Sequence, residues 1–155
     1  MRLEEQGALS DCDAFRIRRI RESDKEAVIA LLNESFPHVG MTRRRLEERI
    51  ARGARFFVAE SCGEVVGFAD MWVGRSACLR GISVKQEWRR KGVGGALLNR
   101  AIVEAKRLGK KSVWLKVQVS NAEAVRFYKE RGFFVKREEE GRFGRMYVMA
   151  RELET

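Results

Sequence analysis

The residues best suited to hold a phosphate group lie close together, between positions 84 and 95. Three glycines fall within four positions there, directly after three basic residues, in the order Arg89, Arg90, Lys91, Gly92, Val93, Gly94, Gly95. A glycine inside a helix or strand costs about 0.5–1 kcal/mol relative to alanine, so the cluster favours a functional reason for the glycines. The stretch opens an apolar pattern typical of a long helix. Because the first N–H groups of a helix are unpaired and carry partial positive charge, this segment predicts a binding site for a diphosphate.

The glycine-rich segment differs from two common phosphate-binding motifs. The sequence contains neither G-x-x-x-x-G-K-[ST] nor G-x-G-x-x-G. The segments before it also do not repeat as strand–helix–strand units. We therefore expect neither a nucleoside triphosphatase loop nor a dinucleotide-binding fold.

A second segment with useful chemistry runs from Asn121 to Phe133 and reads N-A-E-A-V-R-F-Y-K-E-R-G-F. A tyrosine phenol has a pKa near 10 in water, so it is uncharged near neutral pH and donates a proton or a hydrogen bond. Phe127 is a better candidate for the core than Tyr128, because adjacent residues on a helix cannot face the same way.

The elements that must position these residues alternate between strand and helix patterns. We expect helices after the pair Ser23 and Asp24, after Thr42, and over 92–108 and 121–131. The expected strands are 14–20, 55–61, 64–73, 78–84, 112–119, 133–137 and 146–151, with the acidic run 138–141 as the connection between the last two. This order predicts a mixed α/β layout in one domain.

Length and cysteine content limit the classes of protein to which this chain can belong. A chain of 155 residues is enough for one domain with a real core. We interpret residues 1–13 as a flexible N-terminal tail and 14–155 as the domain. No run approaches the roughly 18 apolar residues of a membrane span, so no membrane association is expected. Three cysteines, Cys12, Cys62 and Cys78, and a single histidine predict no disulfide framework, no metal site and a reducing, cytoplasmic compartment.

The charge balance favours an anionic partner. Lys and Arg total 32 against 22 Asp and Glu, which gives a formal net charge of +10. Such a charge attracts nucleic acid, a phosphate-rich cofactor or an acidic protein surface. The basic residues are mostly interleaved with acidic or apolar ones, which is also typical of the charged surface of a heat-adapted protein. No RNP-type motif, zinc finger or basic zipper occurs, so nucleic acid is not the expected partner.

Both functional segments resemble one enzyme family. Residues 89–94, R-R-K-G-V-G, match the [R/Q]-x-x-G-x-[G/A] signature of the GCN5-related N-acetyltransferases (GNAT family), and residues 121–133 are similar to its N-x-x-A-x-x-x-Y…G-F segment. The resemblance covers residues 14–150. It implies an α/β (α+β) fold with one domain, whose mixed, mostly antiparallel sheet has about six or seven strands and about four flanking helices. It also implies that strands 4 and 5 splay apart.

The resemblance also implies a cofactor and roles for particular residues. Family members bind acetyl-CoA and transfer its acetyl group to an amine. The backbone of Ile82, Ser83 and Val84 is expected to pair with the pantetheine arm, and the N–H groups of residues 89–95 are expected to hold the pyrophosphate. Asn121 is expected near the pantetheine and Tyr128 beside the sulfur. The Val84 N–H is the candidate donor to the tetrahedral oxyanion.

The acceptor side of the site offers several candidates for the base. The fifth strand resembles that of N-terminal amine acetyltransferases of the ribosomal-protein and eukaryotic kinds, which carry Glu or His where this chain has Lys116. Lys116 serves as the base only if burial lowers its pKa. Glu34, His38, Asp70 and an ordered water are the alternatives. Phe36, Pro37 and His38 resemble the loop that lines the peptide slot in those relatives.

The expected function is transfer of an acetyl group to a primary amine of a protein or peptide, an N-terminal α-amine or a lysine. An α-amine, with a pKa near 7.7–8.0, is roughly a tenth neutral at pH 7, whereas a lysine amine is neutral in well under a thousandth. A site with a weak base therefore favours the α-amine. Two alternatives stay open: a small-amine acetyltransferase acting on a polyamine, amino acid or aminoglycoside, and a non-catalytic module that binds acetyl-CoA or nucleic acid. A homodimer through the final strand also stays open.

Overall fold

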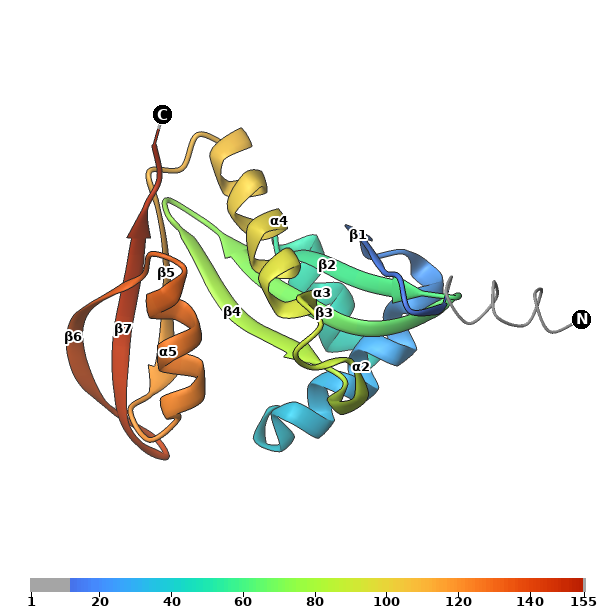
Figure 1. Cartoon of the computed structure of the whole chain (residues 1–155), viewed down its shortest axis with the longest axis horizontal. Coiled ribbons are helices and arrows are strands. Elements are labelled where there is room, and N and C mark those ends of the chain that lie inside the picture. Colours follow the sequence, from blue (N-terminus) through green and yellow to red (C-terminus); the bar gives the residue numbers. More distant parts are fainter. Residues whose placement is uncertain (1–11, 155) are drawn as a thin grey trace, which may run out of the picture.

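Seven strands form one mixed sheet in the order β1-β2-β3-β4-β5-β7-β6 (Figure 1). The computed structural model describes residues 12–154. The strands are β1 (Arg16–Arg19), β2 (Arg55–Ser61), β3 (Glu64–Val73), β4 (Ala77–Val84), β5 (Ser112–Gln118), β6 (Phe134–Gly141) and β7 (Gly144–Glu152). All neighbouring strands are antiparallel except β4 and β5. The predicted fold class, with its mostly antiparallel mixed sheet, is confirmed.

Helices cover both faces of the sheet (Figure 1). One face carries α2 (Lys25–Ser35) and α3 (Arg43–Ala51), and the other carries α4 (Val93–Arg107) and α5 (Ala122–Glu130), with short 3₁₀ turns at η1 (Glu22–Asp24), η2 (Pro37–Val39) and η3 (Gln86–Trp88). The core divides accordingly: Phe68 of β3 packs in the cluster that contains Leu31, whereas Ala69 and Met71 pack in the cluster that contains Leu97. Successive β3 residues thus point to opposite faces, as strand geometry requires. Among residues 12–154 no helix is long and apolar enough to cross a membrane.

The first half of the sheet diverges from the second between β4 and β5. These two strands pair at only two positions, Ala77 with Val113 and Cys78 with Trp114, and then separate. An extra residue in β4 helps to bend it: Asp70 of β3 pairs with Gly81, but Met71 pairs with Leu79, which leaves Arg80 as a bulge. The predicted splay between strands 4 and 5 is therefore confirmed, and it opens a V-shaped gap toward the carboxyl ends of both strands (Figure 1).

Helix α4 begins beside this gap because Gly67 lets it approach the sheet. A Cβ atom at Gly67 would lie 2.9 Å from the carbonyl oxygen of Ser83 and 3.2 Å from Leu97 Cδ1. Only glycine fits between these neighbours without a backbone shift. The contact fixes the amino-terminal turn of α4 against β3 and β4, which is where the predicted phosphate site lies.

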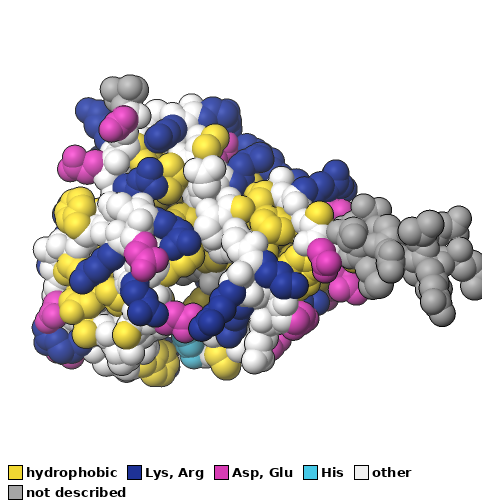
Figure 2. All heavy atoms as spheres, in the orientation of Figure 1, with side chains coloured by type: hydrophobic (Ala, Val, Ile, Leu, Met, Phe, Trp, Pro, Cys, Tyr) yellow, Lys and Arg dark blue, Asp and Glu magenta, His cyan; other side chains and the backbone are white. Residues whose placement is uncertain are grey.

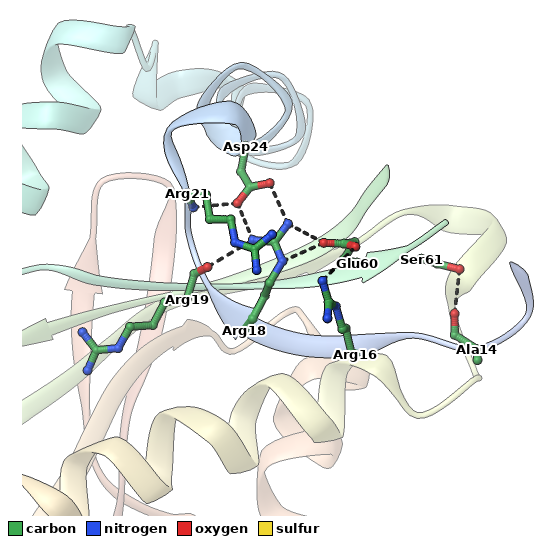
Figure 3. A network of polar contacts seen from close by, with 8 residues as sticks. All are labelled: Ala14, Arg16, Arg18, Arg19, Arg21, Asp24, Glu60 and Ser61. Atoms are coloured by element: carbon green, nitrogen blue, oxygen red, sulfur yellow. Dashed lines mark hydrogen bonds and ion pairs between the residues drawn. The ribbon is translucent and has the colours of Figure 1, made fainter. Parts of the chain in front are cut away.

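The edge strand β1 is held by a buried network of charges (Figure 3). Arg18 donates to both carboxylate oxygens of Asp24, at 2.6 and 2.9 Å, and to Glu60 Oε1 at 2.7 Å. The Asp24 carboxylate also accepts the Arg21 backbone N–H. The Arg18 hydrogen bond is the main cause that lowers the pKa of Asp24. The network joins β1, η1 and β2, which are distant in the sequence.

Two expectations about local structure need correction. Cys12 and Cys62 form a disulfide, whereas the sequence predicted none, because pairing of β1 with β2 carries Cys12 beside the turn between β2 and β3. The end of the predicted tail is thus anchored, and residues 1–11 lie outside the described residues.

The acidic run 138–141 belongs to β6 rather than to a connection, because Arg145 of β7 binds Glu138 and Glu140 across the strands.

The helix starts were predicted with mixed success. Thr42 caps α3 as expected, since its hydroxyl accepts the Arg45 N–H at 3.2 Å. Asp24 precedes α2 but its side chain does not cap that helix. Its carboxylate is engaged by Arg18 instead. A tertiary ion pair has therefore replaced the local interaction that the sequence suggested.

Candidate active site

The loop between β4 and α4 presents unpaired backbone donors. Val93, Gly94 and Gly95 form the first turn of α4, so their N–H groups have no acceptor within the helix. Ala96 is the first residue whose N–H bonds back, to the Gly92 carbonyl at 3.1 Å. Arg90 and Gly92 both have positive φ, +62° and +83°, which turns successive peptide groups so that the loop curls around the helix end. Such a curl of N–H groups at a helix start is an anion-binding shape.

The glycines of this loop lie in two different settings. Gly92 suits the left-handed backbone at this position, where φ is +83°. Lack of space is not the reason for the glycine, because no atom lies within 4 Å of a Cβ built there. Gly94 and Gly95 instead face α5: a Cβ added to the first would lie 3.5 Å from the Phe127 ring, and one added to the second 3.4 Å from the Arg131 guanidinium. These are ordinary van der Waals distances, so the two glycines lie against α5 and Arg131 without being required there by a steric clash.

Positive charge surrounds the loop, and the loop's own three basic residues are not paired with acids. Within residues 12–154, Arg89, Arg90 and Lys91 form no ion pair, although Lys91 Nζ lies 4.9 Å above the Trp88 ring. Arg131 stacks 3.8 Å from the Phe127 ring centroid and donates to the Phe127 carbonyl oxygen at 3.0 Å. Figure 2 views this side of the molecule, where Lys and Arg side chains border a hollow near the middle together with acidic ones along its lower edge. The hollow is electrostatically suited to a polyanionic ligand.

The open edge of β4 lies along the gap. The Lys85 N–H bonds to the Val66 carbonyl at 2.8 Å, and Val84 pairs with Gly67. In an antiparallel ladder this pattern directs the N–H and C=O groups of Val84, and of Ile82 two residues earlier, away from β3. Accordingly, the Val84 carbonyl accepts from Arg89 Nε at 3.3 Å. The N–H and C=O groups of Ile82 and the N–H of Val84 thus remain unpaired along the gap, whereas the Ser83 hydroxyl hydrogen-bonds to Ser35 of α2.

Two residues of the second segment lie on α5. Tyr128 is half-buried and contacts the rings of Phe127 and Phe133, with centroids 5.2 and 5.6 Å away. Burial raises the pKa of Tyr128 to about 12, so the phenol stays protonated at neutral pH. Phe127 and Tyr128 both pack against the same core cluster, so the expected division between a core ring and a functional ring is not strict. Asn121 caps α5 by accepting the Ala124 N–H at 3.2 Å.

Lys116 lacks the burial that a lysine base would need. Its side chain is 45% exposed, and Nζ lies 2.9 Å from Glu139 Oε2 of β6. This ion pair is one that the sequence could not reveal, because it depends on β6 extending through its acidic run. Glu139 in turn binds Arg137, and both partners hold the pKa of Glu139 below its usual range.

A second carboxylate near the gap is deeply buried. Asp70 of β3 is 2% exposed, and its Oδ2 accepts from Arg49 of α3 at 2.6 Å. Burial raises the pKa of Asp70 to about 6 despite the nearby charges of Arg49 and Arg80. Burial also raises the pKa of Cys78 to about 11. These groups lie on the face that carries α2 and α3, where β4 and β5 begin to separate.

The predicted substrate loop reaches across the gap on that same face. The Phe36 ring lies over Gly81, where a Cβ would come within 3.2 Å of it. The His38 ring contacts Phe143, in the turn between β6 and β7, with centroids 5.0 Å apart. Pro37 begins the η2 turn between these two residues. The loop after α2 and the β6–β7 turn therefore meet across the open end of the V (Figure 1).

The structure thus brings most of the expected residues around one gap. The loop 89–95, the β4 edge and Tyr128 belong to the half of the site that α4 and α5 cover. Phe36, His38 and Lys116 lie toward the opposite face. Sequence reasoning missed Glu139 and Phe143; the only signal for Phe143 was an aromatic residue in a short turn. Among the described residues, no group of three or more His, Cys, Asp or Glu is arranged to hold a metal ion.

Comparisons with known proteins agree with this geometry. Residues 17–133 match the model of the acetyltransferase (GNAT) family. The N-alpha-acetyltransferase of Sulfurisphaera tokodaii is 32% identical over 137 residues, which is 77% of this chain and 80% of that protein. The crystal structure of Ard1 from Thermoplasma volcanium is 27% identical, with a TM-score of 0.81 over 92% of this chain and 99% of that one. The yncA protein of Salmonella typhimurium, solved with its cofactor acetyl-CoA, is 25% identical, with a TM-score of 0.77 over 91% of this chain and 95% of that one.

The family match and the overall similarity to solved structures extend well beyond the two short motifs. They include the splayed strands and the loop at the start of α4. The cofactor of this family is acetyl-CoA, whose phosphates suit the basic loop described above. The chain therefore belongs to the GNAT family and is an acetyl-CoA-dependent N-acetyltransferase.

Proposed function

We propose that this enzyme acetylates the N-terminal α-amine of a protein or peptide. The observation that carries the proposal is that β4 and β5 separate beyond the Cys78–Trp114 pair, with different groups on the two faces of the sheet. The basic loop 89–95 lies on the α4 and α5 side, and the contact of His38 with Phe143 lies on the other. The cofactor enters on the first side and the acceptor on the second, so the two meet between the strands.

The cofactor half of the site follows from the backbone. The N–H groups from Arg89 or Arg90 through Gly95 hold the diphosphate, and Ile82 and Val84 add the pantetheine arm to the free edge of β4 as a short strand. Asn121 lies near the pantetheine. The Arg131 guanidinium, held beside Gly95, adds positive charge at the same helix end.

The chemical step is direct attack of the amine on the thioester. The neutral amine forms a bond to the carbonyl carbon, and the resulting oxyanion is stabilised by the Val84 N–H. The carbon–sulfur bond then breaks, and its electron pair stays on the CoA sulfur. Tyr128 lies beside that sulfur and donates a hydrogen bond. Because the pKa of Tyr128 is about 12 and that of a thiol is about 8.5, the phenol acts mainly by stabilising the thiolate rather than by losing its proton.

Three observations favour an α-amine as the acceptor. The exposed and ion-paired Lys116 is poorly suited to deprotonate a lysine side chain, whose pKa is about 10.4. The contact between His38 and Phe143 joins the loop after α2 to the β6–β7 turn on the acceptor side, an arrangement that suits a free chain end better than a continuous chain. The similarity to the N-alpha-acetyltransferase of Sulfurisphaera tokodaii supports the same class of substrate.

The test compares acceptors at a fixed concentration of acetyl-CoA. Release of CoA thiol is measured with peptides that have a free N-terminus, with N-acetylated peptides that contain lysine, and with polyamines. We expect rapid release only with free N-termini. The Tyr128→Phe variant should bind acetyl-CoA with unchanged affinity and release thiol at least about 10²-fold more slowly. Preferred release with polyamines, or full activity of Tyr128→Phe, would contradict the proposal.

A further inference from the structure

The carboxylate of Asp70 is only half satisfied. Oδ2 accepts from Arg49 at 2.6 Å, but within residues 12–154 the buried Oδ1 has no hydrogen-bond partner. Buried polar atoms in folded proteins almost always have a partner, because desolvation without a replacement hydrogen bond is costly. A buried carboxylate oxygen without a donor therefore suggests a donor that arrives with a ligand.

The position of Asp70 relates this oxygen to the reaction. Asp70 pairs with Gly81, next to the Arg80 bulge, at the level where β4 and β5 start to separate. It points to the face of α2 and α3, as its bond to Arg49 shows. The Phe36 ring covers Gly81 on that face. Because Oδ1 is buried, an acceptor reaches it by displacing the Phe36 ring, close to the part of β4 where the pantetheine arm would end.

We propose that Asp70 receives the ammonium group of the acceptor on Oδ1 and removes one of its protons. The inference rests on the proposed function and identifies the base that the sequence left open. The carboxylate becomes a carboxylic acid, and the neutral amine then attacks the thioester carbon. The nitrogen loses its second proton when the tetrahedral intermediate collapses, and the CoA thiolate takes up one proton. Overall, one proton is released to solvent for each acetyl group transferred.

The charged surroundings of Asp70 fit this role. Arg49 approaches from α3, and Arg80 and Cys78 lie on β4, while the β2 neighbour Phe56 is apolar. Burial raises the pKa of Asp70 to about 6, and the two arginines limit the rise. Such a carboxylate is ionised at neutral pH and is still a stronger base than an exposed one. The proton transfer is unfavourable by roughly 10²-fold for an α-amine and by more than about 10⁴-fold for a lysine amine.

The other candidate bases near the gap are less suited to accept a proton from the acceptor. Glu139 is paired with both Lys116 and Arg137, and these partners lower its pKa. Glu34 is exposed at the end of α2. Lys116 is already engaged by Glu139. Asp70 alone in this group combines burial with a free oxygen.

The test is the Asp70→Asn variant, which keeps the shape and still accepts from Arg49. With a free N-terminal peptide at pH 7, we expect kcat to fall at least about 10²-fold, with acetyl-CoA affinity unchanged by calorimetry. The deficit should shrink between pH 7 and 9, because the neutral fraction of an α-amine rises from roughly a tenth to nearly all over this range. A purely structural role would give a deficit that does not depend on pH.

Glu104→Gln is the matched control. Glu104 is also buried, at 3% exposed, and binds three arginines, Arg19, Arg55 and Arg107, but it lies on α4, on the opposite face. It should lower stability without a pH-dependent deficit. An Asp70→Asn enzyme with wild-type kcat, or with a deficit equal at pH 7 and 9, would overturn the inference alone. A wild-type enzyme that acetylates no α-amine would overturn the proposed function and the inference together.

Discussion

Gly92→Ala separates the folding role of the phosphate loop from its binding role. Gly92 has φ of +83°, and nothing lies within 4 Å of a Cβ built on it. The alanine therefore meets no clash, and its cost is the left-handed backbone, about 1–2 kcal/mol. For a domain of this size, 1 kcal/mol corresponds to a change of about 2–4 °C in the unfolding midpoint. We expect the midpoint to fall by about 2–8 °C.

The same helix offers a matched control at its other end. Gly109 follows α4 with φ of +74°, and a Cβ added there likewise has nothing within 4 Å of it. Gly109→Ala should therefore destabilise the protein by a similar amount. Only Gly92→Ala should weaken acetyl-CoA binding, since relaxation of its backbone turns at least one N–H away from the diphosphate. A hydrogen bond to a charged group is worth about 1.5–3 kcal/mol, so we expect at least about a tenfold loss of affinity.

Thermal unfolding and isothermal titration with acetyl-CoA measure the two effects independently. The reasoning would be refuted if both variants bound acetyl-CoA equally well, because the loop conformation would then not matter for the cofactor. It would also be refuted if Gly92→Ala caused no loss of stability, because the left-handed backbone would then not be required.

Three further predictions concern stability and the acceptor side. Because Arg18 depresses the folded-state pKa of Asp24, this pair stabilises the fold above the unfolded pKa near 3.8 and loses its effect as the pH falls through the lower folded value. Arg18→Met should therefore lower the unfolding midpoint at pH 7, and this effect should shrink progressively as the pH falls below 3.8. Arg16→Met, on an exposed side chain, should have little effect at any of these pH values. Reduction of the Cys12–Cys62 disulfide, which spans 50 residues of sequence, should cost about 2–4 kcal/mol of stability, measured by denaturant unfolding with Cys78→Ser as a control, and an unchanged midpoint would contradict the bond. Phe143→Ala should raise KM for a peptide several-fold and leave acetyl-CoA affinity unchanged, whereas Val103→Ala, a control at an equally exposed apolar residue on α4, should change neither.

Local patterns in the sequence correctly predicted much of the fold. Thr42 capped its helix as predicted, and the Cys62-Gly63 pair made the turn between β2 and β3, because both are decided by neighbours in the sequence. The splay between β4 and β5 also followed the resemblance to the family. These features either depend on short-range chemistry or recur throughout a known architecture.

The features that were missed depend on residues brought together by the sheet. The disulfide needs Cys12 and Cys62 to meet through pairing of β1 with β2. The strand at Glu138–Glu140 forms because Arg145 compensates its charges across β7. Gly94 faces Phe127 of α5 and Gly95 faces Arg131, just after that helix, which no pattern within 84–95 could indicate.

Asp70 shows the same limit at the site itself. In the sequence it is one acidic residue in an apolar strand, and it was only one of several candidate bases. Its burial, its bond to Arg49 and its unpaired oxygen appear only once α3 is packed on β3. Long-range packing therefore decides which carboxylate is chemically distinctive.

The central claim is that backbone N–H groups at the start of α4 and along β4 hold acetyl-CoA. Two-dimensional ¹H–¹⁵N NMR during titration with acetyl-CoA tests it most directly. The amide signals of residues 90–95, and those of Ile82 and Val84, should move and saturate together, while the signal of Gly109 stays in place. Saturating cofactor that leaves the signals of residues 90–95 where they were would contradict the account.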